Sequence, residues 1–194
     1  MNRKEKINRK TTETSIELEL NIDGTGKAEV RTPVPFLNHM LESFAKHGNF
    51  DLKIKASGDV GVDPHHLVED IGICLGSTIA GCLKDKKGIR RFGFMILPMD
   101  EAEVTVSLDL GGRPYLRYNV DIANEKIENM DTVLIEDFFR ALVNNSSINL
   151  HINKNVGLNS HHIIEAIFKA FGIALYNATR ITGSNDIPST KGLL

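Results

Sequence analysis

The sequence is poor in several features, and each shortage excludes a class of protein. It has no tryptophan and only two cysteines, Cys74 and Cys82. Both lie in one apolar helical run, so we expect reduced core thiols instead of a disulfide or a metal pair. The net charge is −2, so the chain lacks the excess of basic residues that is typical of a nucleic-acid-binding protein. No apolar run reaches membrane-spanning length, and the basic N-terminus lacks the apolar stretch of a signal peptide. We therefore expect a cytoplasmic protein that binds neither nucleic acid nor membrane.

The chain does contain an internal repeat. A shift of 98 positions places residues 36–54 on residues 134–152, with apolar residues falling on apolar residues. A shift of 96 places "DPHHLVED" on "NSHHIIEA", and a shift of 88 places "ETSIELELNIDG" on "EAEVTVSLDLGG". The sequence thus predicts a tandem duplication, with residues 1–90 as the first half and residues 91–194, including a C-terminal tail, as the second. No low-complexity linker separates the halves, so we expect one compact globule with a shared core.

Both halves show the same order of apolar periodicities. Period-two alternation predicts an opening strand with a second strand after it, and helical periodicity predicts a short and a long helix separated by a strand. The expected elements are strands at 16–22, 104–110, 50–56 and 148–154, short helices at 36–47 and 132–145, long helices at 65–83 and 161–179, and an additional strand at 92–97 that joins the halves. Asp63-Pro64 and Asn159-Ser160 are good starts for the long helices. Without a glycine-rich nucleotide loop, the pattern favours an α+β fold of two β-β-α-β-α units over a doubly wound sheet.

Each long helix opens with the motif His-His-x-x-Glu. Residues four apart share a helix face, which pairs His65 with Glu69 and His161 with Glu165. The neighbouring histidines point about 100° away; these spare histidines are His66 and His162. If the helices meet with pseudo-two-fold symmetry, each spare histidine completes the other pair and the chain holds two ions. One such motif is usually a cap or a surface feature, but two copies at one place in a repeat favour a metal site. The mixed nitrogen and oxygen donors suit Mn, Fe, Co or Zn better than Ca or Mg.

The short helices extend this set of donors. His39 lies in the first short helix, and the repeat places Asp137 at the equivalent position in the second. Pseudo-symmetry therefore predicts that Asp137 is a ligand of the second ion. Its position near a helix start is also typical of a first-turn carboxylate, so the two interpretations stay open.

Several segments together resemble imidazoleglycerol-phosphate dehydratase of histidine biosynthesis. They cover nearly the whole chain in order: "FLNHML", "DPHHLVEDIG", "RRFG", "PMDEA", "GGRPYL", "NSHHIIEAIFKAF" and "PSTKG". Some family members carry a fused phosphatase domain, for which this chain is too short. Two positions depart from the family pattern. "EHFF" reads "EDFF" here, with Asp137, and "FLDHM" reads "FLNHM", with Asn38.

The resemblance implies a dimanganese enzyme with two Mn²⁺ per subunit, or other divalent transition metals in their place. It further implies a homo-oligomer of twenty-four subunits with active sites between subunits, and helices packed between two small mixed sheets. The metal ligands it implies are His39, His65, His66, Glu69, His161, His162 and Glu165. The contacts it implies to a small phosphate substrate are Glu13, His47, Arg91, Arg113, Lys169, Ser189 and Lys191, with His39 counted in both sets.

The implied reaction removes water from D-erythro-imidazole glycerol phosphate and gives imidazole acetol phosphate. The proton that is lost has no carbonyl beside it, so the imidazole ring itself must accept the electrons. A metal on a ring nitrogen would hold the ring as imidazolate, and the neighbouring hydroxyl could leave through a diazafulvene-like intermediate. A carboxylate near the metal is the natural proton carrier. The candidates are Glu13, Glu69, Asp100 and Glu165.

Other classes of protein would also use parts of this pattern. A metal-storage or metal-sensing oligomer needs repeated His/Glu helices but no phosphate contacts. A binuclear metallohydrolase would activate water with its metals and release inorganic phosphate. A structural interaction module explains none of the histidines.

Overall fold

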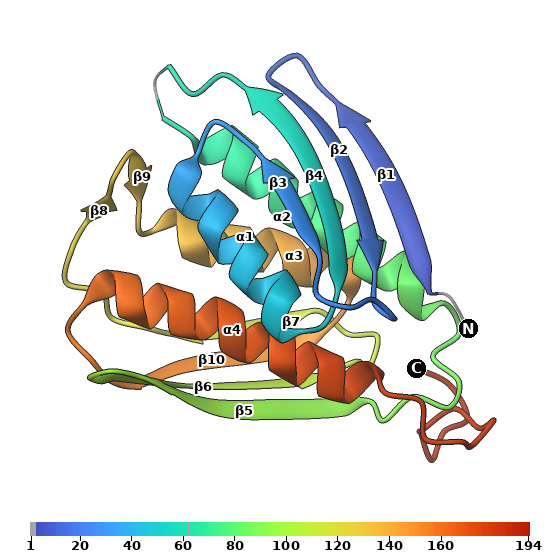
Figure 1. The fold of residues 1–194 in the computed structure, drawn as a ribbon. Helices are drawn as coiled ribbons and strands as arrows, with labels where there is room; N and C mark the ends of the chain where they lie inside the picture. Colours follow the sequence, from blue (N-terminus) through green and yellow to red (C-terminus); the bar gives the residue numbers. More distant parts are fainter. Residues whose placement is uncertain (1–2, 62) are drawn as a thin grey trace.

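Two four-stranded sheets enclose four helices in the computed structural model, which describes residues 3–61 and 63–194 (Figure 1). The first sheet has the order β1-β2-β4-β3 and the second the order β5-β6-β10-β7. Both are mixed, with one parallel pair at one edge and antiparallel pairs elsewhere. The predicted α+β fold with helices between two small mixed sheets is therefore confirmed.

The two halves of the chain build the two sheets and their helices in the same order. The first half contains β1 (Lys4–Lys10), β2 (Thr14–Asn21), β3 (Ala28–Arg31), α1 (Pro35–His47), β4 (Asp51–Gly58) and α2 (His65–Leu83). The second contains β5 (Phe92–Met99), β6 (Ala102–Asp109), β7 (Tyr115–Asn119), α3 (Leu134–Ser146), β10 (Asn149–Val156) and α4 (Ser160–Thr179). A small hairpin of β8 (Lys126–Ile127) and β9 (Met130–Asp131) precedes α3. The predicted division at residues 90 and 91 stays a prediction.

Each repeat unit gains one strand over the predicted β-β-α-β-α order. The additional strand expected to join the halves, β5, pairs with β6 as β1 pairs with β2, so every unit reads β-β-β-α-β-α. The sequence did not indicate β1 because Ile7 is its only apolar residue. Its register is instead supported by cross-strand ion pairs such as Lys4 with Glu19, whose charged atoms lie 2.8 Å apart.

The halves share one core because each long helix packs on the short helix of the other half. α2 packs on α3 and α4 packs on α1. The Phe44 and Phe171 rings stack across the second pair with centroids 5.3 Å apart. Glycine permits the close approach at equivalent places, since a Cβ at Gly76 would lie 2.4 Å from the Leu142 carbonyl oxygen and one at Gly172 would lie 2.5 Å from that of Phe44. Residues from both halves therefore meet along each long helix.

The long helix α2 is apolar enough to resemble a membrane span. By length and composition alone this 19-residue helix passes as a candidate, with a mean hydropathy of 1.3 in its 18-residue window, contrary to the expectation that no run would. However, 67% of its apolar window is buried inside the protein, because α2 lies between the first sheet and α3. Cys74 and Cys82 are buried free thiols in this helix, as predicted.

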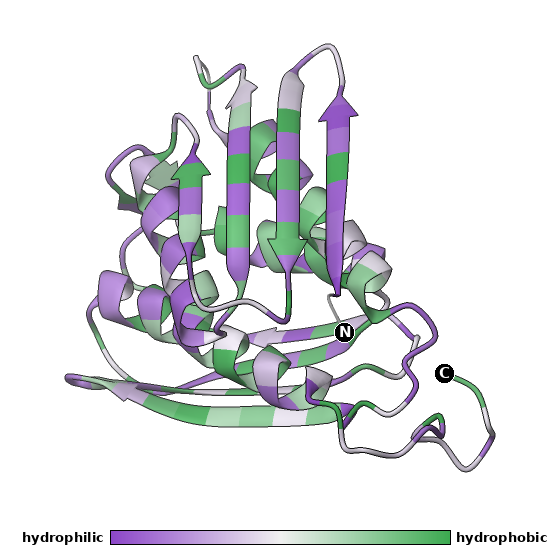
Figure 2. Cartoon of the chain, turned by 45° about the vertical axis from the view of Figure 1, so that its right-hand side comes forward, coloured by the Kyte–Doolittle hydropathy of each residue, from purple (hydrophilic) through white to green (hydrophobic). Residues whose placement is uncertain are grey.

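The outer faces of the two sheets differ in character. Strands of the first sheet alternate between polar and apolar residues, whereas the edge strand β5 of the second sheet is apolar along much of its length (Figure 2). Phe92, Phe94 and Ile96 on its outer face are all more than half exposed. The equivalent positions of β1 carry Lys4, Lys6 and Asn8.

Candidate functional site

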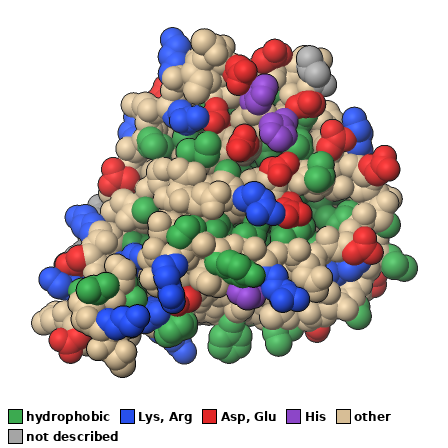
Figure 3. Space-filling view, turned by 180° about the vertical axis from the view of Figure 1, so that it is seen from behind, with side chains coloured by type: hydrophobic (Ala, Val, Ile, Leu, Met, Phe, Trp, Pro, Cys, Tyr) green, Lys and Arg blue, Asp and Glu red, His purple; other side chains and the backbone are tan. Residues whose placement is uncertain are grey.

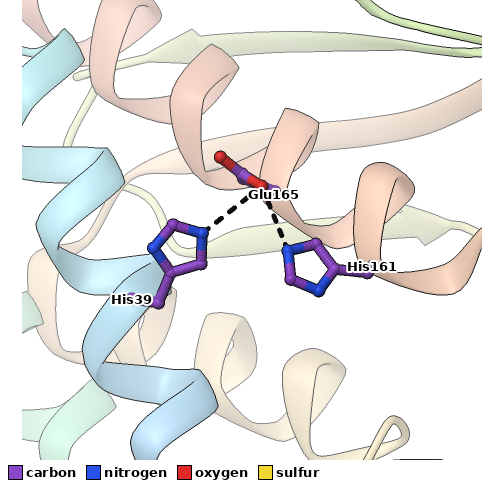
Figure 4. Close-up of side chains that lie close together, drawn as sticks. All are labelled: His39, His161 and Glu165. Carbon is purple, nitrogen blue, oxygen red and sulfur yellow. Dashed lines mark hydrogen bonds and ion pairs between the residues drawn. The ribbon is translucent and has the colours of Figure 1, made fainter.

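The first donor cluster forms where the start of α4 meets α1. Asn159 caps α4, and its side chain accepts hydrogen bonds from the backbone N–H groups of His161 and His162, at 2.9 and 3.4 Å. One turn on, Glu165 Oε2 lies 3.2 Å from His161 Nε2 and 3.4 Å from Nε2 of His39, which α1 supplies (Figure 4). The donor atoms of these three residues all lie within 4.8 Å of one another, close enough to hold a single ion.

Charged neighbours keep Glu165 ionised although its side chain is only 10% exposed. Burial opposes ionisation, but the hydrogen bond and charge of Lys169 and the nearby His39 outweigh it and lower the pKa of Glu165. Lys169 Nζ lies 2.8 Å from Glu165 Oε1. The pKa of His47, on α1, is lowered by burial and by the charge of Lys169. Two of the predicted substrate contacts, His47 and Lys169, therefore lie beside the first cluster.

A second, looser cluster forms where the start of α2 meets α3. His65 Nε2 lies 3.8 Å from Glu69 Oε2, and His65 Nδ1 lies 3.9 Å from Asp137 Oδ2. His65, Glu69 and Asp137 are the repeat equivalents of His161, Glu165 and His39, so the duplication places the same three positions together twice. The cap differs, because Pro64 precedes α2 and the Asp63 side chain accepts only the His65 N–H, at 2.8 Å. Asp137 thus lies where pseudo-symmetry predicted, beside the second His/Glu pair.

The spare histidines point away from both clusters. The His66 ring is perpendicular to that of His65, at 87°, and the His162 ring lies at 83° to that of His161. His66 Nδ1 lies 3.5 Å from Glu13 Oε2, and His162 Nδ1 lies 2.8 Å from Glu101 Oε2. Figure 3 shows histidine side chains among acidic ones on the rear face. Within the described residues of one chain, a spare histidine does not complete the other pair, because the carboxylates beside the spare histidines are Glu13, Asp100 and Glu101 and not Glu69 or Glu165.

Glu101 contacts the predicted ligand His162, and the sequence did not indicate it. The same shift of 88 that aligns the opening strands places Glu13 on Glu101, and this equivalence was the available signal. The hydrogen bond from His162, together with the Asn159 N–H, lowers the pKa of Glu101 to about 2. Glu101 in turn raises the pKa of His162. The predicted candidate Asp100 is more weakly engaged, with Oδ2 3.8 Å from His162 Nε2.

A separate cationic pocket lies under the C-terminal tail. Its volume is about 370 Å³, and its lining includes Arg91, Arg113, Ser189 and Lys191, four of the predicted phosphate contacts. Arg91 makes two bonds to the Asp109 carboxylate, at 2.7 and 3.0 Å, and donates to the Pro188 carbonyl oxygen at 2.8 Å. The pair with Asp109 raises the pKa of Arg91. The tail is therefore fastened over the pocket by one of the cations that line it.

The cationic pocket and the first donor cluster lie at opposite ends of α4. The Arg91 backbone N–H donates to the carbonyl oxygen of Ala178 in the last turn, whereas His161 lies in the first turn. A helix rises 1.5 Å per residue, so these two turns are about 25 Å apart. Figure 1 shows the tail beyond the end of α4, away from the start of the helix.

Comparisons with known proteins agree on one family. A sequence model of the family described as Imidazoleglycerol-phosphate dehydratase matches residues 32–175. An imidazoleglycerol-phosphate dehydratase from Acetivibrio thermocellus is 54% identical over 195 residues, covering 100% of both chains. One from Thermodesulfovibrio yellowstonii is 54% identical over 192 residues, covering 99% of this chain and 100% of the other.

Two crystal structures of proteins of that name have the same fold. The one from Staphylococcus aureus subsp. aureus N315 superposes with a TM-score of 0.84 at 41% identity, covering 92% of this chain and 99% of the other. The one from Pyrococcus furiosus, in complex with (S)-C348, also has a TM-score of 0.84, at 38% identity, covering 97% of this chain and 100% of the other.

Proposed function

The chain belongs to the imidazoleglycerol-phosphate dehydratase family, and from this premise we propose that it is a metal-dependent hydro-lyase. It removes water from D-erythro-imidazole glycerol phosphate and gives imidazole acetol phosphate, a step of histidine biosynthesis in the cytoplasm. The resemblance predicted from the sequence segments is confirmed by the family match and by relatives that cover the full chain.

The donor clusters fit two divalent transition-metal ions per chain. His39, His161 and Glu165 would hold the first ion, because their donor atoms all lie within 4.8 Å of one another. His65, Glu69 and Asp137 would hold the second at the equivalent place. Imidazole and carboxylate donors suit Mn²⁺ and its transition-metal neighbours. When bound, such ions would supply Lewis acidity, which lowers the pKa of a ring N–H on the substrate and lets the electron-rich ring expel the hydroxyl on the carbon attached to it.

The separation between cluster and pocket supports active sites that lie between subunits. In imidazole glycerol phosphate, five bonds of about 1.5 Å link the ring to the phosphorus, so these groups lie less than about 8 Å apart. One substrate cannot bridge the roughly 25 Å between the first cluster and the cationic pocket of one chain. A second copy must therefore bring its pocket to the first copy's cluster. The spare histidines His66 and His162, which point away from their own clusters, are free to complete clusters on other copies.

The exposed apolar strand β5 supports the same homo-oligomeric assembly. Phe92, Phe94 and Ile96 form an apolar outer face where the first sheet has charged and polar residues. Burying such a face against another copy is favourable by about 25 cal/mol per Å² of apolar surface. The assembly of twenty-four subunits that the resemblance implies would bury it many times over.

Other residues of this chain bind the substrate and transfer its proton. Arg91, Arg113, Ser189 and Lys191 bind the phosphate group, since cations and a hydroxyl converge on one pocket. Lys169 and His47 contact the substrate beside the first cluster. Glu13 carries the proton, because within the described residues its carboxylate pairs with His66 alone, at 3.5 Å, whereas Glu165 is committed to Lys169. Glu69 and Asp100 remain the alternative carriers. The hydroxyl on the carbon that bears the imidazole departs as water, the proton leaves the next carbon along the chain, and the resulting enol becomes the ketone.

Turnover and metal content, measured on one preparation, test the proposed function. We expect the purified protein to contain about two transition-metal ions per chain and to convert imidazole glycerol phosphate into a keto product with its phosphate retained. Release of inorganic phosphate would instead indicate a metallohydrolase. Bound metal without turnover would indicate a storage or sensing protein, and turnover by a metal-free enzyme would refute metal dependence.

A further inference from the structure

Glu101 joins the tight turn between β5 and β6 to the first turn of α4. The turn consists of Asp100 and Glu101, and Asp100 adopts a left-handed backbone with φ of 50°. Glu101 Oε1 accepts the backbone N–H groups of Asn159 at 2.9 Å and Leu158 at 3.4 Å. Its other oxygen, Oε2, lies 2.8 Å from His162 Nδ1. One carboxylate thus contacts both the capping residue of α4 and a histidine of the metal-binding motif.

The contact commits Nδ1 of the His162 ring and leaves Nε2, which lies 3.8 Å from Asp100 Oδ2, without a hydrogen bond within the described residues. With Nδ1–H donated to the carboxylate, Nε2 holds the lone pair that binds a metal. A carboxylate behind a ligating histidine fixes the tautomer and the ring orientation and makes the free nitrogen more basic. We propose that Glu101 is a positioning residue, which aims Nε2 of the spare histidine His162 at an ion held by another copy of the chain. This inference rests on the proposed function, because it requires that His162 bind a metal.

The equivalent contact in the first half is looser, and this difference supports separate roles. Glu13 Oε2 lies 3.5 Å from His66 Nδ1, beyond ordinary hydrogen-bond distance, and the Glu13 carboxylate makes no hydrogen bond within the described residues. Glu101, in contrast, contacts three partners from the start of α4. The duplication has therefore placed a free carboxylate, suited to proton transfer, at one position. At the other it has placed a fixed carboxylate, suited to orienting a ligand.

The test measures metal affinity, so it does not depend on activity. Metal-stripped assemblies of the wild type, Glu101→Ala, Glu101→Gln and Glu103→Ala are titrated with Mn²⁺ and Zn²⁺ against a chromogenic chelator. We expect Glu101→Ala to lower the binding affinity for one of the two ions per chain by about tenfold to a hundredfold. Glu101→Gln should recover part of this loss, because its amide oxygen can still accept the Nδ1–H. Glu103→Ala is the matched control from the same hairpin. Glu103 accepts a hydrogen bond from the Asn155 side chain at 2.9 Å and contacts no histidine.

A second pair of variants separates positioning from a general effect on α4. In the His162→Ala background, Glu101→Ala should have no further effect on either affinity, because its only route to the metal has been removed. A further loss in that background, or equal weakening of both ions, would show that Glu101 acts by stabilising the helix start and would overturn the inference. Two ions of wild-type affinity in Glu101→Ala would also overturn it while leaving the proposed function intact. A wild-type protein that binds no ion would refute the proposed function itself.

Discussion

Replacing Asp137 with alanine is expected to remove one of two ions from each chain and to leave the fold almost unchanged. Asp137 Oδ2 lies 3.9 Å from His65 Nδ1, at the place that His39 occupies in the first cluster. The family pattern that the sequence resembles has histidine at this position, and the carboxylate here is a shorter donor that adds negative charge.

The expected magnitudes differ strongly between the two possible roles. Outer partners of metal ligands typically contribute tenfold to a hundredfold in affinity, and removal of a ligand itself should cost at least as much. A carboxylate that serves only the first turn of a helix contributes about 0.3–1 kcal/mol to stability, through the helix dipole. Asp137 lies in the first turn of α3, so alanine should lower the free energy of unfolding by no more than this amount.

Elemental analysis of desalted protein, together with urea unfolding of the metal-free form, distinguishes these roles. Glu136→Ala is the matched control, because Glu136 shares the first turn of α3 but pairs with Arg140 and not with a histidine. We expect about one ion per chain in Asp137→Ala and two in both Glu136→Ala and Asp137→His. Full metal content in Asp137→Ala, or equal loss in the Glu136 control, would refute the assignment of Asp137 as a ligand.

Three further predictions concern the assembly, the core and the thiols. Phe94→Lys, which gives β5 the charge of its counterpart strand, should reduce the particle mass measured by light scattering, and an unchanged mass would exclude β5 from the subunit contacts. Asp70→Ala should lower the free energy of unfolding by about 1–3 kcal/mol, because it leaves the Arg9 guanidinium without its partner at 2.9 Å; a urea midpoint equal to that of the wild type would contradict this. Burial raises the pKa of Cys74 to about 11 and that of Cys82 to about 12, so neither should react with a thiol reagent at pH 8 until the protein is unfolded. Rapid labelling of the native protein would show that this part of α2 opens readily.

The sequence predicted those elements whose apolar residues repeat with a clear period. β2 alternates Ile16, Leu18 and Leu20 toward the core, and all three are buried, so its strand character is local. β1 has a single apolar residue, and it becomes a strand through pairing with β2, which no local pattern reveals. The hairpin of β8 and β9 has two residues in each strand, too few for a period.

In the candidate site, too, the sequence predicted contacts within one helix but not contacts between residues far apart in the chain. The pair of His161 and Glu165 follows from helical spacing, and the structure places these residues 3.2 Å apart as predicted. The contact of His39 with Glu165 depends instead on α1 packing against the long helix of the other half. The contact of Glu101 with His162 joins residues 61 positions apart, so spacing alone could not reveal it. The separation of the cationic pocket from the first cluster likewise emerges only once α4 lies between them.

The central claim is that each active site combines one subunit's donor cluster with the cationic pocket of another. Two variants test it, Glu165→Gln in the first cluster and Arg113→Ala in the cationic pocket, each expected to be nearly inactive alone. The measurement is dehydration of imidazole glycerol phosphate by assemblies formed from equal amounts of the two variants after joint dissociation and reassembly. If cluster and pocket come from different subunits, random mixing restores about a quarter of the sites, and activity should return to about a quarter of the wild-type value. Activity no greater than that of the separate variants would contradict the account, because sites within single chains cannot be repaired by mixing.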